Sequence, residues 1–393
     1  MKMNRDMNND INNDTFGLYL HIPFCQGKCR YCDFYSVNFE QALLEKYLSY
    51  LKKELLSYSI LLQGKGRKVE LETIYFGGGT PGLLSAEELA QVLDLISQEF
   101  SLSPLAEVSL EVNPSSLTGE KLQAYRKSGI NRLSIGVQSF NDRELSFLGR
   151  RHDAREAREK IELAGRYFDN YSIDLIYAIP DQELADWERT LQQAIQLSPY
   201  HVSLYSLQIE EGTPLASSLA AGEFEETDNS LDAEMYLLAR QFLRASGYEH
   251  YEISNFARNG YQSRHNRLYW EFRPYLGVGP GSHSFMGGER FWNHADLSLY
   301  MEKLNQGELP VQERIQLSRE EQMAEMVFMG LRLLEGVSLT EFYKMFNVSL
   351  TEYYAREIEK LQSQGLITIG NDRISLTEKG LLLGNLVFME FLP

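Results

Sequence analysis

Three cysteines lie close together near the N-terminus, and the sequence contains no others. Cys25, Cys29 and Cys32 have the spacing C-x₃-C-x₂-C and directly follow Leu18–Ile22, a short apolar segment typical of a β-strand. An odd number of cysteines within eight residues does not suit a disulfide framework, and such clusters are more often metal ligands. Three thiolates on a four-iron cluster would leave one iron open to an outside ligand, such as the amino and carboxylate groups of S-adenosylmethionine (SAM). Electron transfer to the sulfonium of SAM could then cleave a C–S bond.

The spacing by itself leaves two other kinds of site open. Structural zinc usually takes four protein ligands, and His21 is the only nearby candidate for the fourth. Redox thiols need a C-x-x-C pair, which Cys29 and Cys32 supply. Asp33 follows that pair where a c-type haem attachment site needs histidine, so the sequence excludes this third kind of site.

Strand-like and helix-like segments alternate over about the first 245 residues. This alternation predicts parallel strands joined by right-handed crossovers, and therefore an α/β protein with an open, incomplete (β/α)₆ barrel. Chemistry in such folds takes place at the C-terminal ends of the strands. The six predicted strands are Leu18–Ile22, Thr73–Phe76, Glu107–Val112, Arg132–Val137, Ser172–Ile176 and His201–Gln208.

Several segments around the cysteines and strand ends resemble a known family. They are HIPFC at 21–25, CRYCDF at 29–34, GGGTP at 77–81 and EVNP at 111–114. They resemble the radical-SAM group that contains oxygen-independent coproporphyrinogen III oxidase and the HemW-type haem chaperones, and the likeness covers nearly the whole chain. The resemblance implies a [4Fe–4S] cluster on Cys25, Cys29 and Cys32, with SAM beside it.

The same resemblance implies the residues that bind SAM. Gly78, Gly79 and Thr80 would contact its amino group, and Glu111 its ribose. Arg150 would pair with its carboxylate, as a guanidinium suits a carboxylate; Arg151 is adjacent. The remaining residues of this implied set are Tyr19 beside the cluster, Gln138 at the end of the fourth strand and Asp174 within the fifth.

Two features separate the haem chaperones from the oxidases. The oxidases carry a further cysteine where this chain has Phe34, and they have an N-terminal extension where this chain has a short polar tail. The segment His265–Trp270 fits the HNxxYW pattern of HemW-type proteins, which makes His265 the candidate haem ligand, because imidazole is a common axial ligand. His283 is a second, weaker candidate. Without the resemblance, the simpler interpretation of His265 is a core histidine beside two packing aromatics.

These features predict a haem chaperone that binds haem, a [4Fe–4S] cluster and SAM, and delivers haem to an acceptor protein such as a membrane cytochrome. The alternative is an oxygen-independent coproporphyrinogen III oxidase, which converts two propionates to vinyl groups by radical hydrogen abstraction. The substrate distinguishes them: iron-bearing haem or metal-free coproporphyrinogen.

Composition restricts the partners. The formal net charge of −17 argues against nucleic acid or anionic lipid as the main partner, because both need a basic surface. No segment has the pattern of a transmembrane helix, and the polar N-terminus lacks the apolar core of a signal peptide. We therefore expect a cytoplasmic protein.

The sequence predicts four regions: a disordered tail at 1–15, the radical-SAM barrel at 16–247, an extension with the HNxxYW motif at 248–315, and a C-terminal helical domain at 316–393. The last region has a helix–helix–hairpin order that resembles a winged helix. Its predicted elements are helices Ser318–Arg332, Leu339–Phe346 and Leu350–Gln364 and a hairpin Leu366–Leu376.

Overall fold

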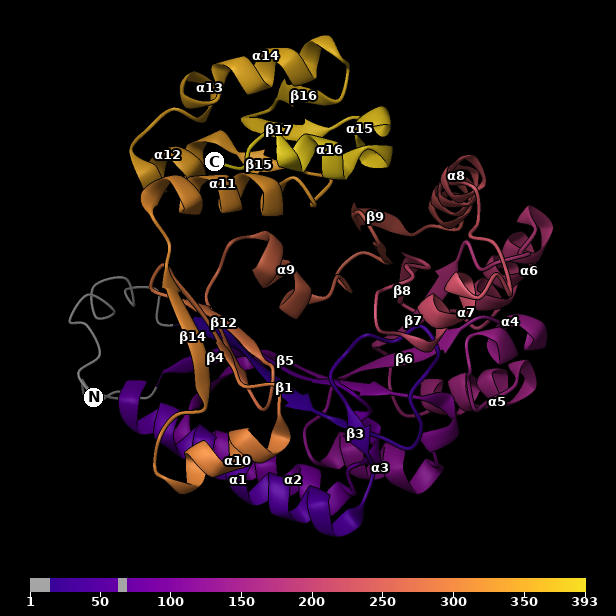
Figure 1. Ribbon diagram of the computed structural model, residues 1–393, viewed down its shortest axis with the longest axis vertical. Helices are drawn as coiled ribbons and strands as arrows, with labels where there is room; N and C mark the ends of the chain where they lie inside the picture. Colours follow the sequence, from indigo (N-terminus) through magenta and orange to yellow (C-terminus); the bar gives the residue numbers. More distant parts are fainter. Residues whose placement is uncertain (1–14, 63–68) are drawn as a thin grey trace.

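The structure, a computed structural model, describes residues 15–62 and 69–393. The tail predicted at 1–15 lies outside the described residues except for Thr15, which already belongs to the first strand. Within the described part of the chain, twelve strands form one sheet in the order β14-β13-β12-β11-β1-β4-β5-β6-β7-β8-β10-β9. Figure 1 shows this sheet curving around an interior, with helices on its outer side.

Six strands at the centre of the sheet correspond to the six predicted ones. Neighbouring members pair in parallel throughout, which confirms the incomplete (β/α)₆ barrel. The strands are β1 (Thr15–Ile22), β4 (Glu70–Gly78), β5 (Ser101–Val112), β6 (Arg132–Gln138), β7 (Tyr171–Tyr177) and β8 (His201–Ser206).

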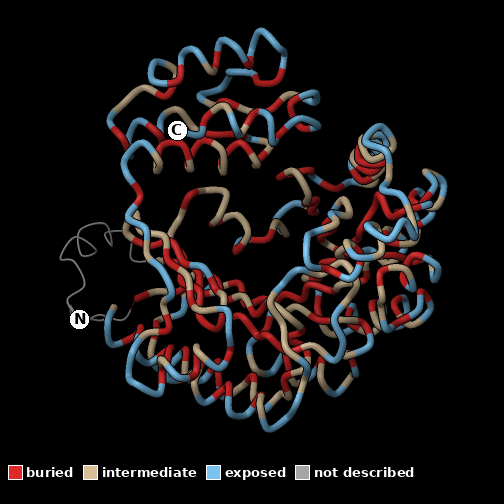
Figure 2. The backbone as a smooth tube through the Cα atoms, in the orientation of Figure 1, coloured by how far each residue is buried: buried red, intermediate tan, exposed pale blue. Residues whose placement is uncertain are grey.

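Helices cover the outer face of these strands. Alternation along β1 explains why: Leu18, Leu20 and Ile22 are fully buried, whereas Tyr19, pointing the other way, stacks with Tyr75 in the interior. Figure 2 shows the buried residues concentrated along the sheet. The covering helices are α1 (Gln41–Leu62), α2 (Ala86–Glu99), α3 (Gly119–Lys127), α5 (Ala154–Gly165), α6 (Leu184–Gln196) and α8 (Asn229–Ala245). Two shorter helices, α4 (Asp142–Phe147) and α7 (Pro214–Ala220), contact Arg30 in the segment after β1.

The segment after the barrel extends both edges of the sheet. One of its strands, β11 (Tyr275–Val278), pairs in parallel with β1 and so adds a seventh parallel strand. Two helices that the sequence did not predict also lie here, α9 (Arg264–Trp270) and α10 (Leu297–Asn305). The other strands are β9 (Glu249–Glu252), β10 (Asn255–Ala257), β12 (His283–Met286), β13 (Glu289–Asn293) and β14 (Val311–Gln316).

The C-terminal region is a separate layer of helices above α9 (Figure 1). Its three-stranded sheet is β15-β17-β16, and the predicted hairpin turns at Asn371 and Asp372, which both have the positive φ that a tight hairpin turn requires. The helix predicted at Leu350–Gln364 is two helices that meet at Tyr354. The elements are α11 (Arg319–Gly330), β15 (Val337–Ser338), α12 (Leu339–Phe346), α13 (Leu350–Tyr353), α14 (Ala355–Ser363), β16 (Ile367–Gly370), β17 (Arg373–Leu376), α15 (Glu378–Leu382) and α16 (Gly384–Met389).

Candidate functional site

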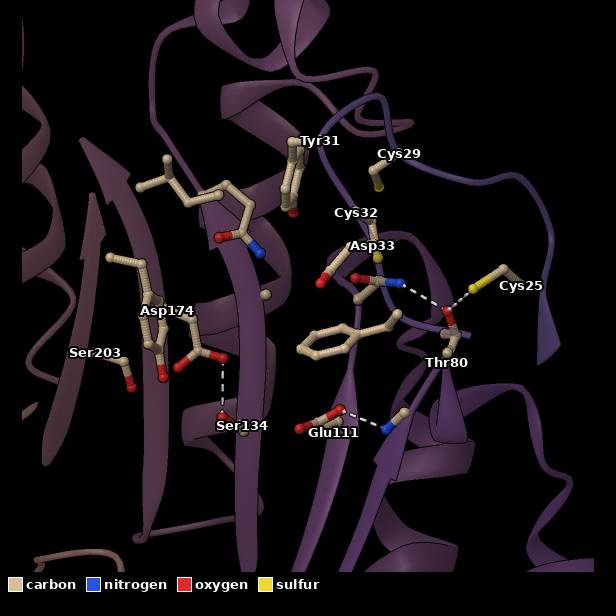
Figure 3. A pocket seen from close by; sticks show the side chains of 18 of the residues that line it. Cys25, Cys29, Tyr31, Cys32, Asp33, Thr80, Glu111, Ser134, Asp174 and Ser203 are labelled. Carbon is tan, nitrogen blue, oxygen red and sulfur yellow. Dashed lines mark hydrogen bonds between the residues drawn. The ribbon is translucent and has the colours of Figure 1, made fainter. Parts of the chain in front are cut away.

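A cavity of about 470 Å³ lies at the C-terminal ends of the parallel strands and extends into the barrel interior. Cys25, Cys29 and Cys32 lie at its mouth, and Glu111 and Asp174 lie deeper (Figure 3). Its size is that of a small-molecule site, and its lining combines aromatic groups with converging polar ones.

The cysteine loop follows β1 and is anchored at several points. The Thr80 hydroxyl lies 3.6 Å from Cys25 Sγ, and Arg150 Nη1 donates to Cys29 Sγ over 3.2 Å. Arg30, between the cysteines, donates to Ser218 Oγ over 2.9 Å. Burial raises the pKa of the Cys32 thiol. The loop is therefore held at Cys25, at Cys29 and between Cys29 and Cys32.

The cysteines and His21 can be compared with what a single metal ion requires. Among the described residues, no three His, Cys, Asp or Glu side chains are grouped so that they could hold one metal ion. His21, the candidate fourth zinc ligand, has Nδ1 3.1 Å from the Tyr19 hydroxyl and Nε2 3.1 Å from the Tyr35 carbonyl. A four-iron cluster would bind each thiolate through a different iron, so it does not require the three thiolates to converge on one point.

The glycine-rich turn after β4 fits closely under the cysteine loop. Gly78 has a φ of +111°, a conformation that side chains rarely adopt. A Cβ on Gly79 would approach the backbone oxygen of Phe24 to 2.7 Å. Both glycines are needed for this turn to line the cavity directly beside Cys25.

Glu111 and Asp174 present carboxylates to the cavity from neighbouring parts of the sheet (Figure 3). Glu111 accepts from the Tyr75 hydroxyl over 2.8 Å and from the Gly78 backbone N–H over 3.2 Å. Burial raises its pKa to about 7, although the hydrogen bond from Tyr75 acts in the opposite direction. Asp174 accepts from Ser134 over 2.9 Å, and burial raises its pKa as well.

Gln138 and Arg150 also line the cavity. Gln138 is one of few residues other than glycine with a positive φ, 72°, which turns the chain at the end of β6. Arg150 Nη2 donates to Asn113 Oδ1 and to the Gly136 carbonyl, each over 2.6 Å, and no acceptor among the described residues lies within hydrogen-bond distance of its Nε. Arg151 instead is exposed and donates to the Gln26 carbonyl.

Most of the predicted cluster and SAM residues thus converge on one cavity. Those that line it are Cys25, Cys29, Cys32, Gly78, Gly79, Thr80, Glu111, Gln138, Arg150 and Asp174.

Two predicted residues lie behind the cavity wall. Tyr19 stacks with Tyr75 at 6.2 Å and lies 6.4 Å from the His265 ring. His265 on α9 is only 1% exposed, with Nδ1 2.7 Å from Thr73 Oγ1 and Nε2 2.8 Å from the Tyr269 hydroxyl. Burial lowers its pKa to about 3, so the ring is neutral. Both its nitrogens are thus engaged within the protein.

Three further residues of the interior were not predicted from the sequence. Arg132 is 1% exposed and lines the cavity floor, where no acceptor among the described residues reaches its Nε or Nη1. Asn266 on α9 lines the same floor. His201 is fully buried behind Asp174. Side chains alternate between the two faces of a strand, and only this alternation along β6 and β8 could have indicated that Arg132 and His201 face the interior.

Comparisons with known proteins agree with this geometry. The model of the Radical SAM superfamily matches residues 19–194, and that of the HemN C-terminal domain matches residues 317–383. "Heme chaperone HemW" of Bacillus subtilis is 36% identical over 376 residues, which are 95% of this chain and 98% of that protein. "Heme chaperone HemW" of Mycobacterium tuberculosis is 36% identical and covers 96% of this chain and 95% of its own.

A solved structure, coproporphyrinogen III oxidase (HemN) from Escherichia coli, has the same fold. Its TM-score is 0.83, and the match covers 96% of this chain and 90% of that one, at 24% identity. Over the part of the chain that the structure describes, no helix is long and apolar enough to cross a membrane.

Proposed function

We propose that this protein is a haem chaperone, because its chain belongs to the HemW family of the radical-SAM superfamily. One observation carries the proposal: relatives named as haem chaperones align with 95% or more of this chain and with nearly all of their own length. The likeness therefore includes the barrel, the extension with α9 and the C-terminal layer together.

The cavity suits a [4Fe–4S] cluster with SAM. Cys25, Cys29 and Cys32 would each bind one iron of the cluster, and SAM would bind the fourth iron. On reduction, SAM would supply a reactive adenosyl group. The protein's own residues orient the ligand: the Gly78–Thr80 turn gives backbone a close approach, Glu111 offers acceptors for ribose, and Arg150 a guanidinium for the carboxylate.

Phe34 supports the chaperone over the coproporphyrinogen oxidase. It lines the cavity mouth and is 63% exposed, at the position where the resemblance gives the oxidases a further cysteine. An exposed ring beside the cluster offers an apolar face to a flat ligand and no thiol.

Two histidines are candidates for the axial haem ligand. His265 is the candidate from the HNxxYW motif, but binding iron would require it to give up its hydrogen bond to Thr73 or to Tyr269. His283 on β12 is exposed and stacks with Trp292 at 5.5 Å. The imidazole of His283 is accessible from outside, although His283 is not among the residues that line the cavity.

The acceptor, the location and the region boundaries belong to the same proposal. We infer that haem passes to an acceptor protein, for example a membrane cytochrome, and that the chain acts in the cytoplasm. We also propose the division into a barrel at 16–247, an extension at 248–315 and a C-terminal domain at 316–393, which follows the order of the elements along the chain.

An anaerobic haem titration of the cluster-reconstituted protein, followed by its Soret band, tests the proposal. We expect saturation near one haem per chain. His265→Ala and His283→Ala are compared, with His294→Ala as a matched control in the same extension. A spectral change confined to one variant identifies the ligand. Non-saturating binding that is the same in all four proteins, together with vinyl products from coproporphyrinogen, would establish the oxidase instead.

A further inference from the structure

A buried row of polar side chains runs from the cavity carboxylate Asp174 to the start of α9. The Ser172 hydroxyl donates to Asp174 Oδ1 over 3.1 Å and lies 2.8 Å from His201 Nδ1. His201 Nε2 lies 2.9 Å from the Tyr251 hydroxyl. The Ser263 backbone N–H, at the N-cap of α9, donates to that hydroxyl over 3.2 Å. All members of the row are buried or line the cavity.

One consistent set of donors and acceptors runs along this row when Ser172, which also lies 3.4 Å from Ser203 Oγ, gives its proton to Asp174. Ser172 has one hydroxyl proton, which it gives to Asp174, so it must accept from His201 Nδ1–H. Burial lowers the pKa of His201 well below its usual range, so its other nitrogen, Nε2, carries a lone pair and accepts from the Tyr251 hydroxyl. Tyr251 in turn accepts from Ser263 N–H. Each donor therefore points toward Asp174.

A one-directional row of hydrogen bonds that ends on a carboxylate favours its ionised form and fixes its orientation, because each bond polarises the next. Ser134 donates to the second oxygen of Asp174 over 2.9 Å. Both oxygens are thus held from the protein side, while the cavity side stays open to a donor group of a ligand.

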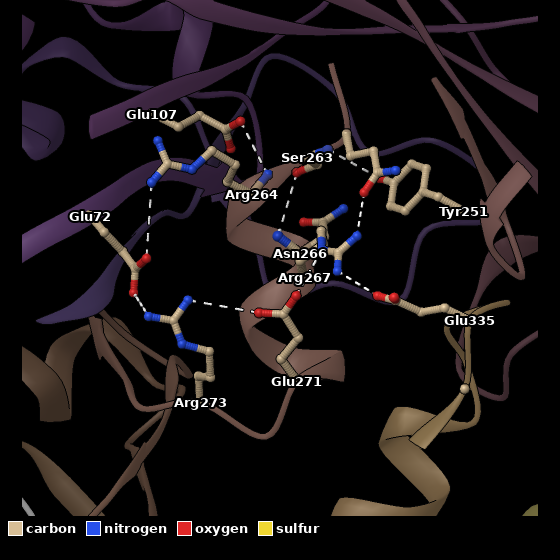
Figure 4. A network of polar contacts seen from close by, with 12 residues as sticks. Glu72, Glu107, Tyr251, Ser263, Arg264, Asn266, Arg267, Glu271, Arg273 and Glu335 are labelled. Carbon is tan, nitrogen blue, oxygen red and sulfur yellow. Dashed lines mark hydrogen bonds and ion pairs between the residues drawn. The ribbon is translucent and has the colours of Figure 1, made fainter. Parts of the chain in front are cut away.

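The far end of the row is as firmly held as its middle. Glu107 accepts from the backbone N–H groups of Arg264 and His265, each over 3.1 Å, and so fixes the first turn of α9. Arg267, further along α9, forms an ion pair with Glu335 of the C-terminal layer over 2.6 Å (Figure 4). The anchored start of α9 therefore gives the row a fixed origin.

We propose that His201 and Tyr251 are positioning residues that hold Asp174 ready to accept a hydrogen bond from a hydroxyl or amine group of a nucleoside ligand. Neither touches the cavity ligand; both act through Ser172. The inference rests on the proposed binding of SAM and specifies which buried residues set its affinity.

The experiment measures the dissociation constant of SAM by equilibrium dialysis against the cluster-reconstituted protein, with iron content checked in every variant. His201→Phe keeps an aromatic ring at this position but removes both nitrogens, and we expect SAM binding to weaken about tenfold. His201→Asn places an amide N–H where Nδ1 lies, so it should restore affinity to within about threefold of the unaltered protein. Rescue by asparagine would not occur if the histidine only filled space.

A second variant and a control complete the test. Tyr251→Phe removes a single hydroxyl from the row, and we expect a loss of about threefold, which keeps the proposal testable if His201→Phe fails to fold. His250→Phe is the matched control: His250 is also buried, it stacks on Phe256 at 4.1 Å, and it hydrogen-bonds to the Ile253 carbonyl, away from the cavity. Its affinity for SAM should be unchanged.

The two failures are distinguishable. If the unaltered protein with a full cluster does not bind SAM, the proposed function is wrong. If it binds SAM but His201→Phe and Tyr251→Phe bind it equally well, or asparagine is no better than phenylalanine at position 201, the positioning role is wrong.

Discussion

At the open end of the barrel the three cysteines and Arg150 are half-buried around a cavity, whereas at the closed end His265, on α9, and Glu107, which binds the start of α9, are buried. At the open end, Arg150 Nε has no acceptor among the described residues. At the closed end, both nitrogens of His265 and both oxygens of Glu107 have partners. Polar groups left available suit ligand binding, and groups satisfied internally suit positioning.

The cysteine loop should show the largest effect, because it has no substitute ligands. Cys29→Ala removes one of three thiolates, and no other cysteine exists in the chain. We expect loss of the cluster, measured as iron and acid-labile sulfide per chain after reconstitution. Gln26→Ala, in the same loop, is the control and should retain full loading. A normal cluster in Cys29→Ala would contradict the assignment of the open end.

A substitution at Glu111 tests whether this carboxylate, which lies deeper in the cavity than the cysteines, takes part in binding SAM. Glu111→Gln keeps the shape of the side chain but removes its charge, so SAM affinity should fall by about tenfold to a hundredfold in equilibrium dialysis. Because burial raises the pKa of Glu111 to about 7, the affinity of the unaltered protein should increase as pH rises through about 7. In Glu111→Gln this part of the pH dependence should be absent.

The same pKa shift has the opposite effect on the stability of the ligand-free protein. The folded-state pKa of Glu111 is about 7 and lies above the unfolded value of about 4.3, so the folded state binds more protons between these values. The stabilising contribution of the protonated form is therefore present at low pH and lost as pH rises through about 7. In Glu111→Gln, the free energy of unfolding measured with urea should therefore fall less steeply with pH over that range than in the unaltered protein. If the free energy of unfolding has the same slope against pH in both proteins, Glu111 is ionised over this whole pH range.

A substitution at Gly79 tests whether the turn after β4 must pack directly against the Phe24 backbone. In Gly79→Ala the new Cβ would meet the Phe24 backbone, which cannot move without displacing Cys25, so we expect a loss of about 1–3 kcal/mol and reduced cluster loading. Gly370→Ala is the control, since nothing lies within 4 Å of a Cβ there. Chemical denaturation measures both. Equal stability of the two variants would mean that the turn can relax.

The ion pairs that Arg267 of α9 makes should matter least. Arg267→Ala removes bonds to Glu271 and Glu335, but both partners are partly exposed, so the loss should stay within about 1 kcal/mol by denaturation, with SAM affinity unchanged. A clear fall in SAM affinity would instead show that the closed end as a whole, and not only its buried row, positions the cavity carboxylates.

The sequence determined the local features of this protein. The C-x₃-C-x₂-C spacing, the alternating strands and helices and the hairpin at Asn371 all follow from short-range patterns, and the structure contains each of them. Helix α9 was missed because seven residues rich in aromatic and charged side chains carry no helical periodicity.

Only the tertiary structure decided which polar residues meet. His201 and Arg132 are far from the cysteines in sequence, and nothing local marks them, but the register of β6, β7 and β8 turns them into the same interior. Likewise, the sequence motif predicts an available imidazole at His265, while in the fold Thr73 and Tyr269 take both of its nitrogens. Spacing along a chain fixes which groups can act together within one loop, whereas contacts between distant strands depend on how the whole sheet closes.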